Sequence, residues 1–288
     1  MAIRMILVPV RGDGKGEGVL DHALVLARRF NAHLNVVHSH AKPEDMVPFG
    51  TLGVTEDMRK QIVEAATAVA ESEEARVKTL LTDYLKDQGV PIIEAATDTA
   101  EAVTASWIEE TGEQAANVAV LGRLADLIIV AKPDSEDGLG SRTLQAALLE
   151  GGKPVMMVPP APAKTIGAHV ALGWNGANES AKAISATLTL MKAADRVSVF
   201  SAPVSTEPRL AVDKLVDYLR RHEITAEAEI IDVKASEVGA ALLGGAKKAG
   251  ADVLVMGAYG HSRARQLVMG GVTSHVIENA DMPVILVD

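Results

Sequence analysis

Three glycines near the end of the chain have a spacing that suits a phosphate. Gly257, Gly260 and Gly270 form a G-x2-G-x9-G pattern, and the first of them directly follows the apolar run Val253–Met256. In an open parallel sheet, ligands bind outside the carboxyl ends of the strands. Glycines at that edge can adopt positive φ and let backbone N–H groups approach an anion closely. Gly271 then opens a helical segment, whose N-terminus also favours anions.

This segment, together with ALGWNGANESAKAI at Ala171–Ile184, resembles the universal stress protein family. Nucleotide-binding members of that family carry G-x2-G-x9-G followed by Ser or Thr, after the fourth strand of a five-stranded parallel sheet. Two positions depart from this pattern: Gly271 stands in place of the Ser or Thr, and Asn175 in place of the Asp that closes the first strand. The resemblance implies a site for an adenine nucleotide, ATP with or without Mg²⁺.

On this resemblance, the nucleotide contacts residues from two strand ends. The expected set is Gly173, Trp174, Asn175, Met256, Gly257, Gly260, Arg263, Gly270, Gly271, Val272 and Thr273. Backbone N–H groups of the glycines would hold the phosphates, Thr273 would add a hydroxyl, and Arg263 would add a guanidinium. Met256 would pack against the sugar or base. The competing interpretations are turn formation for the glycines, a solvated loop surface for Arg263, and an Asx-turn or helix cap for Asn175.

The implied activity is binding rather than dedicated catalysis. The sequence has no Walker lysine and no paired carboxylates, so machinery for phosphoryl transfer is missing. His261 has no second catalytic group beside it, and His38 and His40 have no third ligand nearby, so we assign no catalytic residue and no metal site. We expect a stress-response sensor or regulator with at most slow ATP hydrolysis. The alternatives are a nucleotide-free scaffold for protein–protein interaction and an enzyme of the related adenine-nucleotide α-hydrolase type.

Composition limits the cellular setting. Apolar residues make up 48% of the 288 residues and aromatic residues 3%, which suits helices packed on both faces of a parallel sheet. The sequence has no cysteine, which excludes disulfides, thiol catalysis and Cys-ligated metals. The start of the sequence lacks a signal-peptide pattern, and no stretch reaches membrane-spanning length. We therefore expect a cytoplasmic protein.

The net charge of −10 lies almost entirely in the first half of the chain. Residues 1–163 contain 15 Lys and Arg against 24 Asp and Glu, which leaves 13 against 14 for residues 164–288. An acidic first half repels nucleic acid and anionic membrane surfaces, so we expect neither as a partner. The nearly neutral second half is the better place for a phosphate.

The chain is predicted to contain two diverged copies of one β/α unit. Its two endings repeat, because GGKPVMMVP and ADMPVILVD each join a helix end, a proline and a short apolar strand. Alternating strands and helices predict two doubly wound, Rossmann-like α/β domains, each with a parallel five-stranded sheet of order 3-2-1-4-5. The expected strands are Ile3–Val10, His33–Val37, Ile92–Ala95, Leu127–Ala131, Pro154–Val158, His169–Gly173, Val197–Ser201, Ala228–Val233, Val253–Met256 and Pro283–Val287. Helical segments include Val19–Arg29, Thr143–Glu150, Ser180–Met191, Val212–Arg221 and Val238–Ala249.

Three prolines in four residues mark the linker Pro159–Gly167, because they fit neither a helix nor a central strand. We place one domain at residues 1–160 and the other at residues 166–288, each with its own sheet. Members of the resembling family dimerise through their terminal strands, so Val284–Val287 is expected to pair with Val155–Val158 in an intramolecular pseudo-dimer, with a homodimer as a further possibility. The insertion at residues 41–88 is predicted to contain an extended crossover helix on the sheet.

The first copy lacks the glycine pattern. Its corresponding loop, AKPDSEDGLGSRT at Ala131–Thr143, is shorter, and three acidic residues lie where phosphate would sit: Asp134, Glu136 and Asp137. The glycine-rich run RGDGKGEG at Arg11–Gly18 matches neither G-x-G-x-x-G nor G-K-[ST]. We interpret the first copy as degenerate for nucleotide.

Overall fold

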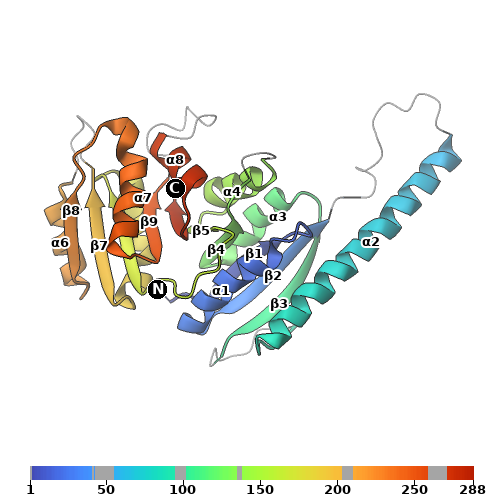
Figure 1. The fold of residues 1–288 in the computed structure, drawn as a ribbon. Helices are drawn as coiled ribbons and strands as arrows, with labels where there is room; N and C mark the ends of the chain where they lie inside the picture. Colours follow the sequence, from blue (N-terminus) through green and yellow to red (C-terminus); the bar gives the residue numbers. More distant parts are fainter. Residues whose placement is uncertain are drawn as a thin grey trace.

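The described part of the chain forms one ten-stranded sheet with helices on both faces (Figure 1). The computed structural model describes residues 2–40, 42, 55–94, 102–134, 138–202, 210–258 and 271–288. The strand order across the sheet is β3-β2-β1-β4-β5-β10-β9-β6-β7-β8. The α/β class and the doubly wound, mostly parallel arrangement predicted from the sequence are confirmed.

The elements follow one another as two rounds of alternating strands and helices. The strands are β1 (Met5–Val10), β2 (His33–His40), β3 (Thr104–Thr111), β4 (Leu127–Ala131), β5 (Val155–Val158), β6 (His169–Trp174), β7 (Arg196–Ser201), β8 (Ala226–Ile230), β9 (Val253–Gly257) and β10 (Val284–Val287). The helices are α1 (Gly16–Phe30), α2 (Glu56–Asp87), α3 (Gln114–Leu121), α4 (Leu139–Glu150), α5 (Asn178–Lys192), α6 (Val212–Arg221), α7 (Val238–Ala249) and α8 (Gly271–Asn279).

The two halves share a single sheet, so the expectation of two separate sheets is wrong. The reason is the pairing that the sequence suggested between the two final strands: β10 runs antiparallel to β5, with Ile285 opposite Met156. The other strand pairs of the sheet are parallel. An unpaired terminal strand would leave a row of backbone donors and acceptors without partners. By pairing with each other, β5 and β10 satisfy the backbone groups that each would otherwise leave unpaired.

Each face of the sheet carries its own hydrophobic core, built from both halves. The first core lies under α1, α2, α5 and α6 and includes Leu20, Leu81, Ile184 and Leu219. The second lies under α3, α4, α7 and α8 and includes Leu144. Strand side chains alternate between the two faces, so successive buried residues of β4, β5, β9 and β10 enter different cores. This is why these four strands are continuous apolar runs in the sequence.

The third strand of the first half lies later in the chain than the sequence suggested. We expected Ile92–Ala95, whereas β3 is Thr104–Thr111 and pairs with β2 along its whole length. Ile92 makes a single bridge to Ala105. Because β3 is an edge strand with mostly half-exposed side chains, its sequence TASWIEET lacks the continuous apolar run by which we recognised the inner strands.

The long insertion forms the helix that its composition predicted. α2 has 32 residues, of which Val77, Leu81 and Leu85 are the buried ones. Near its C-terminal end, the Tyr84 hydroxyl donates a hydrogen bond to the Asp21 carboxylate of α1. The N-terminal part of α2 extends beyond the sheet (Figure 1). The prediction of a helix lying on the sheet is therefore correct for its C-terminal half.

The helices shorter than α2 match the predictions in most places. α6 and α7 begin and end at the predicted residues, and α1, α4 and α5 are slightly longer than expected. α3 was not predicted, because its eight residues, QAANVAVL, are too few to show a helical period clearly. Among the described helices, none is long and apolar enough to cross a membrane.

One aspartate in each half fastens the first strand to the fourth. In the second half, the Asp252 carboxylate accepts hydrogen bonds from the backbone N–H groups of Gly167 (2.8 Å), Ala168 (3.0 Å) and His169 (3.2 Å). In the first half, Asp126 accepts from the N–H groups before and at the start of β1, at 2.8 and 3.0 Å. These two carboxylates therefore set where β6 and β1 begin relative to β9 and β4.

We predict that Asp252→Ala lowers the free energy of unfolding by roughly 1–3 kcal/mol, because three backbone donors lose a charged acceptor. Asp252→Asn should cost less, since its amide oxygen can still accept. Urea denaturation monitored by circular dichroism measures both.

The matched control is Asp195→Ala, which removes an exposed carboxylate close to the same linker. Its effect should stay within about 0.5 kcal/mol, as is usual for a surface substitution. Equal denaturation midpoints for Asp252→Ala and Asp195→Ala would contradict a fastening role for Asp252.

Candidate functional site

The site predicted in the second half lies where β6 and β9 end side by side. Gly173 of β6 is in register with Met256 of β9, so the two stretches that carry the predicted residues meet at one carboxyl edge. α5 begins just after β6, and α8 begins at Gly271. Helix N-termini present free backbone N–H groups and a positive dipole end. The edge therefore has the arrangement that favours an anion in a doubly wound fold.

Gly257 is required at this edge for a reason that sequence analysis missed. A Cβ atom added at Gly257 would lie 2.6 Å from the carbonyl carbon of Glu179 and 2.7 Å from the amide nitrogen of Ser180. The first turn of α5 therefore packs directly on the end of β9, leaving no room for a side chain. The sequence argument allowed positive φ at these glycines, but neither Gly257 nor Gly271 has a φ in the left-handed region. For Gly257, close helix–strand packing is the requirement, and the backbone conformation is not.

The neighbouring side chains point to different faces of the sheet. Met256 is 5% exposed and belongs to the second core, against Gly173, where an added Cβ would lie 3.3 Å from the Met256 Cβ. Trp174 is 4% exposed and belongs to the first core, where its indole N–H donates to the carbonyl of Leu210 at 3.1 Å. Trp174 and Met256 therefore face opposite sides of the sheet, because alternate strand residues do so.

Asn175 has the local role that competed with ligand contact. Its side-chain oxygen accepts a hydrogen bond from the Ala177 backbone N–H at 3.0 Å, which closes an Asx-turn before α5. Gly176, inside this turn, has a φ of 73°, a conformation that glycine adopts at low cost. The turn sets the direction in which α5 leaves the strand. Asn175 thus determines the path of the backbone at this carboxyl edge.

The remaining predicted residues fall at the start of α8 or outside the described part of the chain. Gly271 is the first residue of α8, and an added Cβ there would contact nothing within 4 Å. Val272 packs against the second core, and Thr273 is 5% exposed. Gly260, Arg263 and Gly270, together with His261, lie outside the described residues.

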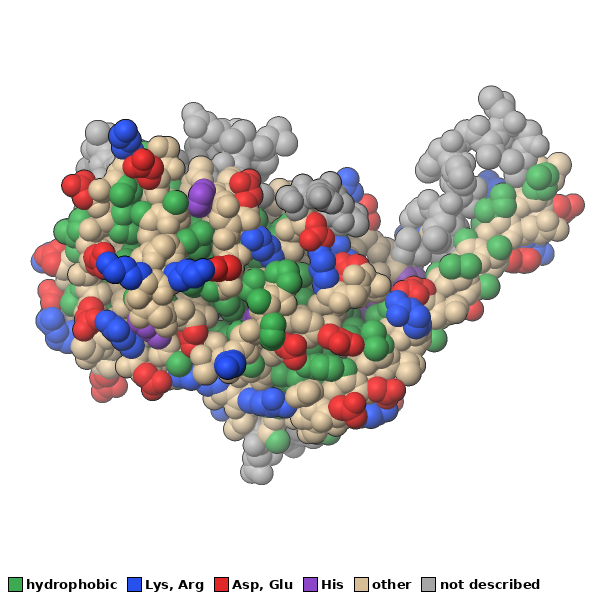
Figure 2. Space-filling model, in the orientation of Figure 1, with side chains coloured by type: hydrophobic (Ala, Val, Ile, Leu, Met, Phe, Trp, Pro, Cys, Tyr) green, Lys and Arg blue, Asp and Glu red, His purple; other side chains and the backbone are tan. Residues whose placement is uncertain are grey.

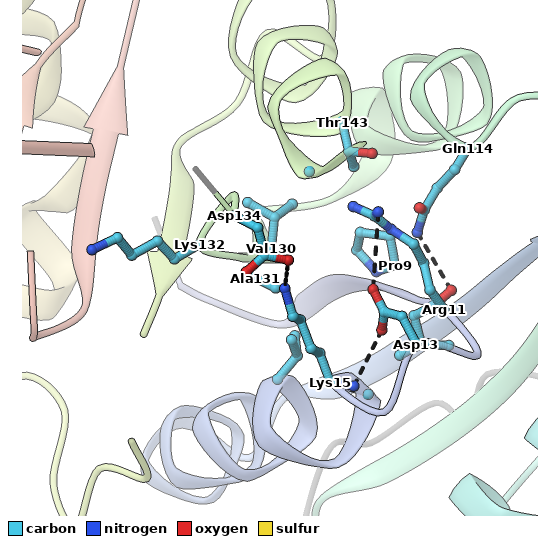
Figure 3. A pocket seen from close by; sticks show the side chains of 14 residues that line it. Pro9, Arg11, Asp13, Lys15, Gln114, Val130, Ala131, Lys132, Asp134 and Thr143 are labelled. Carbon is cyan, nitrogen blue, oxygen red and sulfur yellow. Dashed lines mark hydrogen bonds and ion pairs between the residues drawn. The ribbon is translucent and has the colours of Figure 1, made fainter. Parts of the chain in front are cut away.

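The corresponding edge of the first half is nearly filled by its own side chains (Figure 3). The cavity between the ends of β1 and β4 measures about 20 Å³, room for about one water molecule. Ligand sites usually measure about 300–1,000 Å³. Lys15, at the start of α1, forms an ion pair with Asp134 across the cavity. Among the described residues, this cavity is far smaller than such a site.

Other polar contacts hold this closed arrangement in place. Arg11 lies 3.9 Å from Asp13, whose carboxylate also accepts the Lys15 backbone N–H at 3.1 Å. Gln114 of α3 donates to the Val10 carbonyl at 3.4 Å. The sequence identified Asp134 as a residue unfavourable to phosphate, but not Lys15 as its partner. Glu136 and Asp137, predicted beside it, lie outside the described residues.

A group of titratable side chains lies between α2 and the carboxyl ends of β2 and β3. Burial lowers the pKa of His38, which is 6% exposed, with a further lowering by the nearby His40. A hydrogen bond with Glu109, together with burial, raises the pKa of Glu74. Within the described residues, no three His, Asp or Glu side chains are arranged to hold a metal ion. These groups help to hold α2 against β3.

The fold and the second-half edge define a class: a tandem chain of two doubly wound α/β units with one glycine-rich carboxyl edge. Residues 166–288 match the model of the Universal stress protein family. This match covers the second half of the chain. No protein with a curated functional description matches the sequence.

Solved structures extend the likeness in fold to the first half. A universal stress protein from Archaeoglobus fulgidus DSM 4304 matches with a TM-score of 0.70 and 12% identity, over 100% of this chain and 97% of that one. A functionally unknown protein from Pseudomonas aeruginosa PAO1 matches with a TM-score of 0.57 and 15% identity, over 99% and 92%. At such identities the likeness shows the shared fold alone.

We predict that Gly257→Ala destabilises the protein by roughly 1–3 kcal/mol even without ligand, because the added methyl group overpacks the contact between β9 and α5. Gly244→Ala in α7 is the control, since a Cβ there contacts nothing within 4 Å. It should leave stability unchanged or raise it by up to about 1 kcal/mol. Urea midpoints compare the two variants, and a Gly257→Ala midpoint at or above that of the wild type would refute the packing role.

Proposed function

We propose that the second half of the chain binds an adenine nucleotide, ATP with or without Mg²⁺, and acts as a stress-response sensor or regulator with at most slow hydrolysis. The observation that carries the proposal is the position of the glycine pattern. It begins at Gly257, the last residue of β9, and ends beside Gly271, the first residue of α8. The pattern thus starts at the carboxyl end of β9 and leads in sequence to the start of α8, within a chain segment that matches the universal stress protein model.

The physical chemistry of this edge favours a polyphosphate. α5 and α8 both begin here, and backbone N–H groups at helix N-termini bind anions well. In the proposal, the glycines and Val272 supply N–H groups, Thr273 a hydroxyl and Arg263 a guanidinium to the phosphates. Asn175 replaces the carboxylate that the family pattern has at the end of the first strand, so a bound Mg²⁺ would be held mainly by phosphate oxygens and water.

The first half, residues 1–160 in this proposal, is a structural domain without nucleotide. Its cavity of about 20 Å³ and the Lys15–Asp134 ion pair support this assignment. Opening the cavity for a phosphate would require breaking that ion pair and placing the ligand beside Asp13 and Asp134, two carboxylates that repel it. The protein would then bind one nucleotide per chain.

A nucleotide-free scaffold is the second candidate, and one observation favours it. The Asn175 side-chain oxygen is already used in the turn before α5, and Gly271 offers no hydroxyl. In that case the glycine segment serves as a connection between β9 and α8. Nucleotide released from freshly purified, denatured protein and identified by mass spectrometry separates the two candidates.

We predict that isothermal titration with ATP gives about one site per chain. The double variant Lys15→Ala/Asp134→Ala, which removes the ion pair from the first-half cavity, should keep the ATP affinity of the wild type. Two equivalent sites would show that the first half also binds, and a complete lack of binding would favour the scaffold.

Gly260→Val should weaken ATP binding by about a hundredfold or more, because losing two hydrogen bonds to a charged phosphate costs about 1.5–3 kcal/mol each. A β-branched residue at this position would also block the close backbone approach that the proposal requires. Gly138 of the first half is unsuitable as a control, since its φ of 62° would strain a valine. If Gly260→Val binds ATP like the wild type at an unchanged melting temperature, the glycine segment is structural and the nucleotide proposal fails.

A further inference from the structure

The crossover helix α2 is far longer than the fold requires. The second half provides an internal comparison, because the equivalent crossover from β7 to β8 uses α6, a helix of 10 residues. α2 has 32 residues, yet it buries three side chains, against two for α6. The first half therefore carries about six helical turns that its own core does not use.

An open groove runs along the outer side of α2 where it passes α1. Its volume is about 720 Å³, and Ala75, Leu80 and Tyr84 of α2 are the apolar residues of its lining. Leu80 is 44% exposed. Burial, aided by the hydrogen bond to Asp21, raises the pKa of Tyr84, so this lining residue stays neutral.

The rim of this groove is acidic. Glu17 of α1 and Asp83 and Asp87 of α2 line it, and its cation, Arg76, is paired with Glu73 at 2.5 Å. Among the described residues, neither Glu17 nor Asp87 forms an ion pair, whereas Asp83 pairs with Lys86 at 3.1 Å on the surface. The groove thus combines apolar lining residues with a net negative charge.

Exposed apolar side chains continue along the part of α2 that extends beyond the sheet. Met58, Ile62, Val69 and Leu80 are 51%, 37%, 66% and 44% exposed. At about 100° per residue their directions fall within a sector of about 40°, so they form one stripe on the helix. Figure 2 shows hydrophobic side chains along α2 among acidic ones. Apart from the cap by Thr55 and the backbone of α2 itself, no hydrogen bond or ion pair among the described residues ties residues 56–72 to the rest of the chain.

We propose that this surface, the α2 groove with its stripe, docks a basic amphipathic helix of a partner protein. Leucine-like side chains on one face of the partner would cover Leu80 and the stripe, and its lysines or arginines would meet Glu17, Asp83 and Asp87. This is the usual way in which a helix binds an apolar groove. Opposite charge at the rim speeds association and selects the partner. The proposal is independent of nucleotide binding.

The charges favour this occupant over a second copy of the chain. The protein has a net charge of −10, most of it in the half that carries α2, so two copies that meet at this surface repel each other. A basic partner gains from the same field.

The test uses the full-length protein and a fluorescein-labelled synthetic helix of about 18 residues, about 27 Å long, with leucines on one face and lysines on the other. A second peptide keeps the leucine face and carries glutamates in place of the lysines. Fluorescence anisotropy should show binding of the lysine peptide, weakened by added salt, and at least tenfold weaker binding of the glutamate peptide. Equal affinity for both peptides, or no binding of the lysine peptide, would overturn the proposal.

Two pairs of variants locate the binding. Leu80→Asp should weaken the lysine peptide at least tenfold, whereas Leu124→Asp, at a residue 85% exposed elsewhere, should not. The triple variant Glu17→Gln/Asp83→Asn/Asp87→Asn should weaken it and reduce its salt dependence. A triple variant with the same charge change on the second half, Asp213→Asn/Asp217→Asn/Glu223→Gln, should bind like the wild type. If both triples lose affinity equally, the peptide binds by net charge and the groove is not its site. Sedimentation velocity that shows a dimer dissociated by Leu80→Asp would instead assign the surface to a second copy.

Discussion

The antiparallel pairing of β5 with β10 is the constraint on which the rest of the molecule depends. It joins two parallel sheets into one and places corresponding helices of the two halves on the same face. Both strands are fully buried, so separating the halves would expose two apolar strands and their unpaired backbone groups. Every other strand is positioned outward from this seam. β4 lies beside β5, and β9 lies beside β10. Each half alone would leave its strand of the seam exposed next to the strand that carries its carboxyl edge.

Patterns within a few residues predicted much of this fold. The fully buried strands were recognisable as apolar runs, and α6 and α7 were predicted to the residue. β3 escaped because an edge strand alternates with solvent, and the apolar stretch at Ile92 competed with it. The closure of the first-half cavity could be predicted in part: the acidic loop residue Asp134 was recognised, but its partner Lys15 lies 119 positions away, and only the folded chain brings them together. The packing role of Gly257 has the same origin, since its neighbours Glu179 and Ser180 belong to α5, which β7 and β8 separate from β9 in the chain.

A lysine connects the two halves at the seam. Lys132, just after β4, donates a hydrogen bond to the carbonyl of Ala280 at 2.9 Å, directly after α8. Burial at this contact lowers the pKa of Lys132. The cation thus lies against the carboxyl end of the helix whose first residue adjoins the glycine pattern, an arrangement that the helix dipole favours. A shift of α8 along its axis would therefore strain this hydrogen bond at the end of β4, beside the cavity of the first half.

The ion pair between Lys15 and Asp134 gives the chain a built-in asymmetry. In an ordinary dimer of identical subunits, a mutation that closes one cleft closes both, because one gene encodes the two. Here the two clefts are encoded separately on a single polypeptide, so one can be sealed while the other is left free to change. The character of each edge is thus encoded separately at synthesis, and neither dilution nor exchange of subunits can alter the combination.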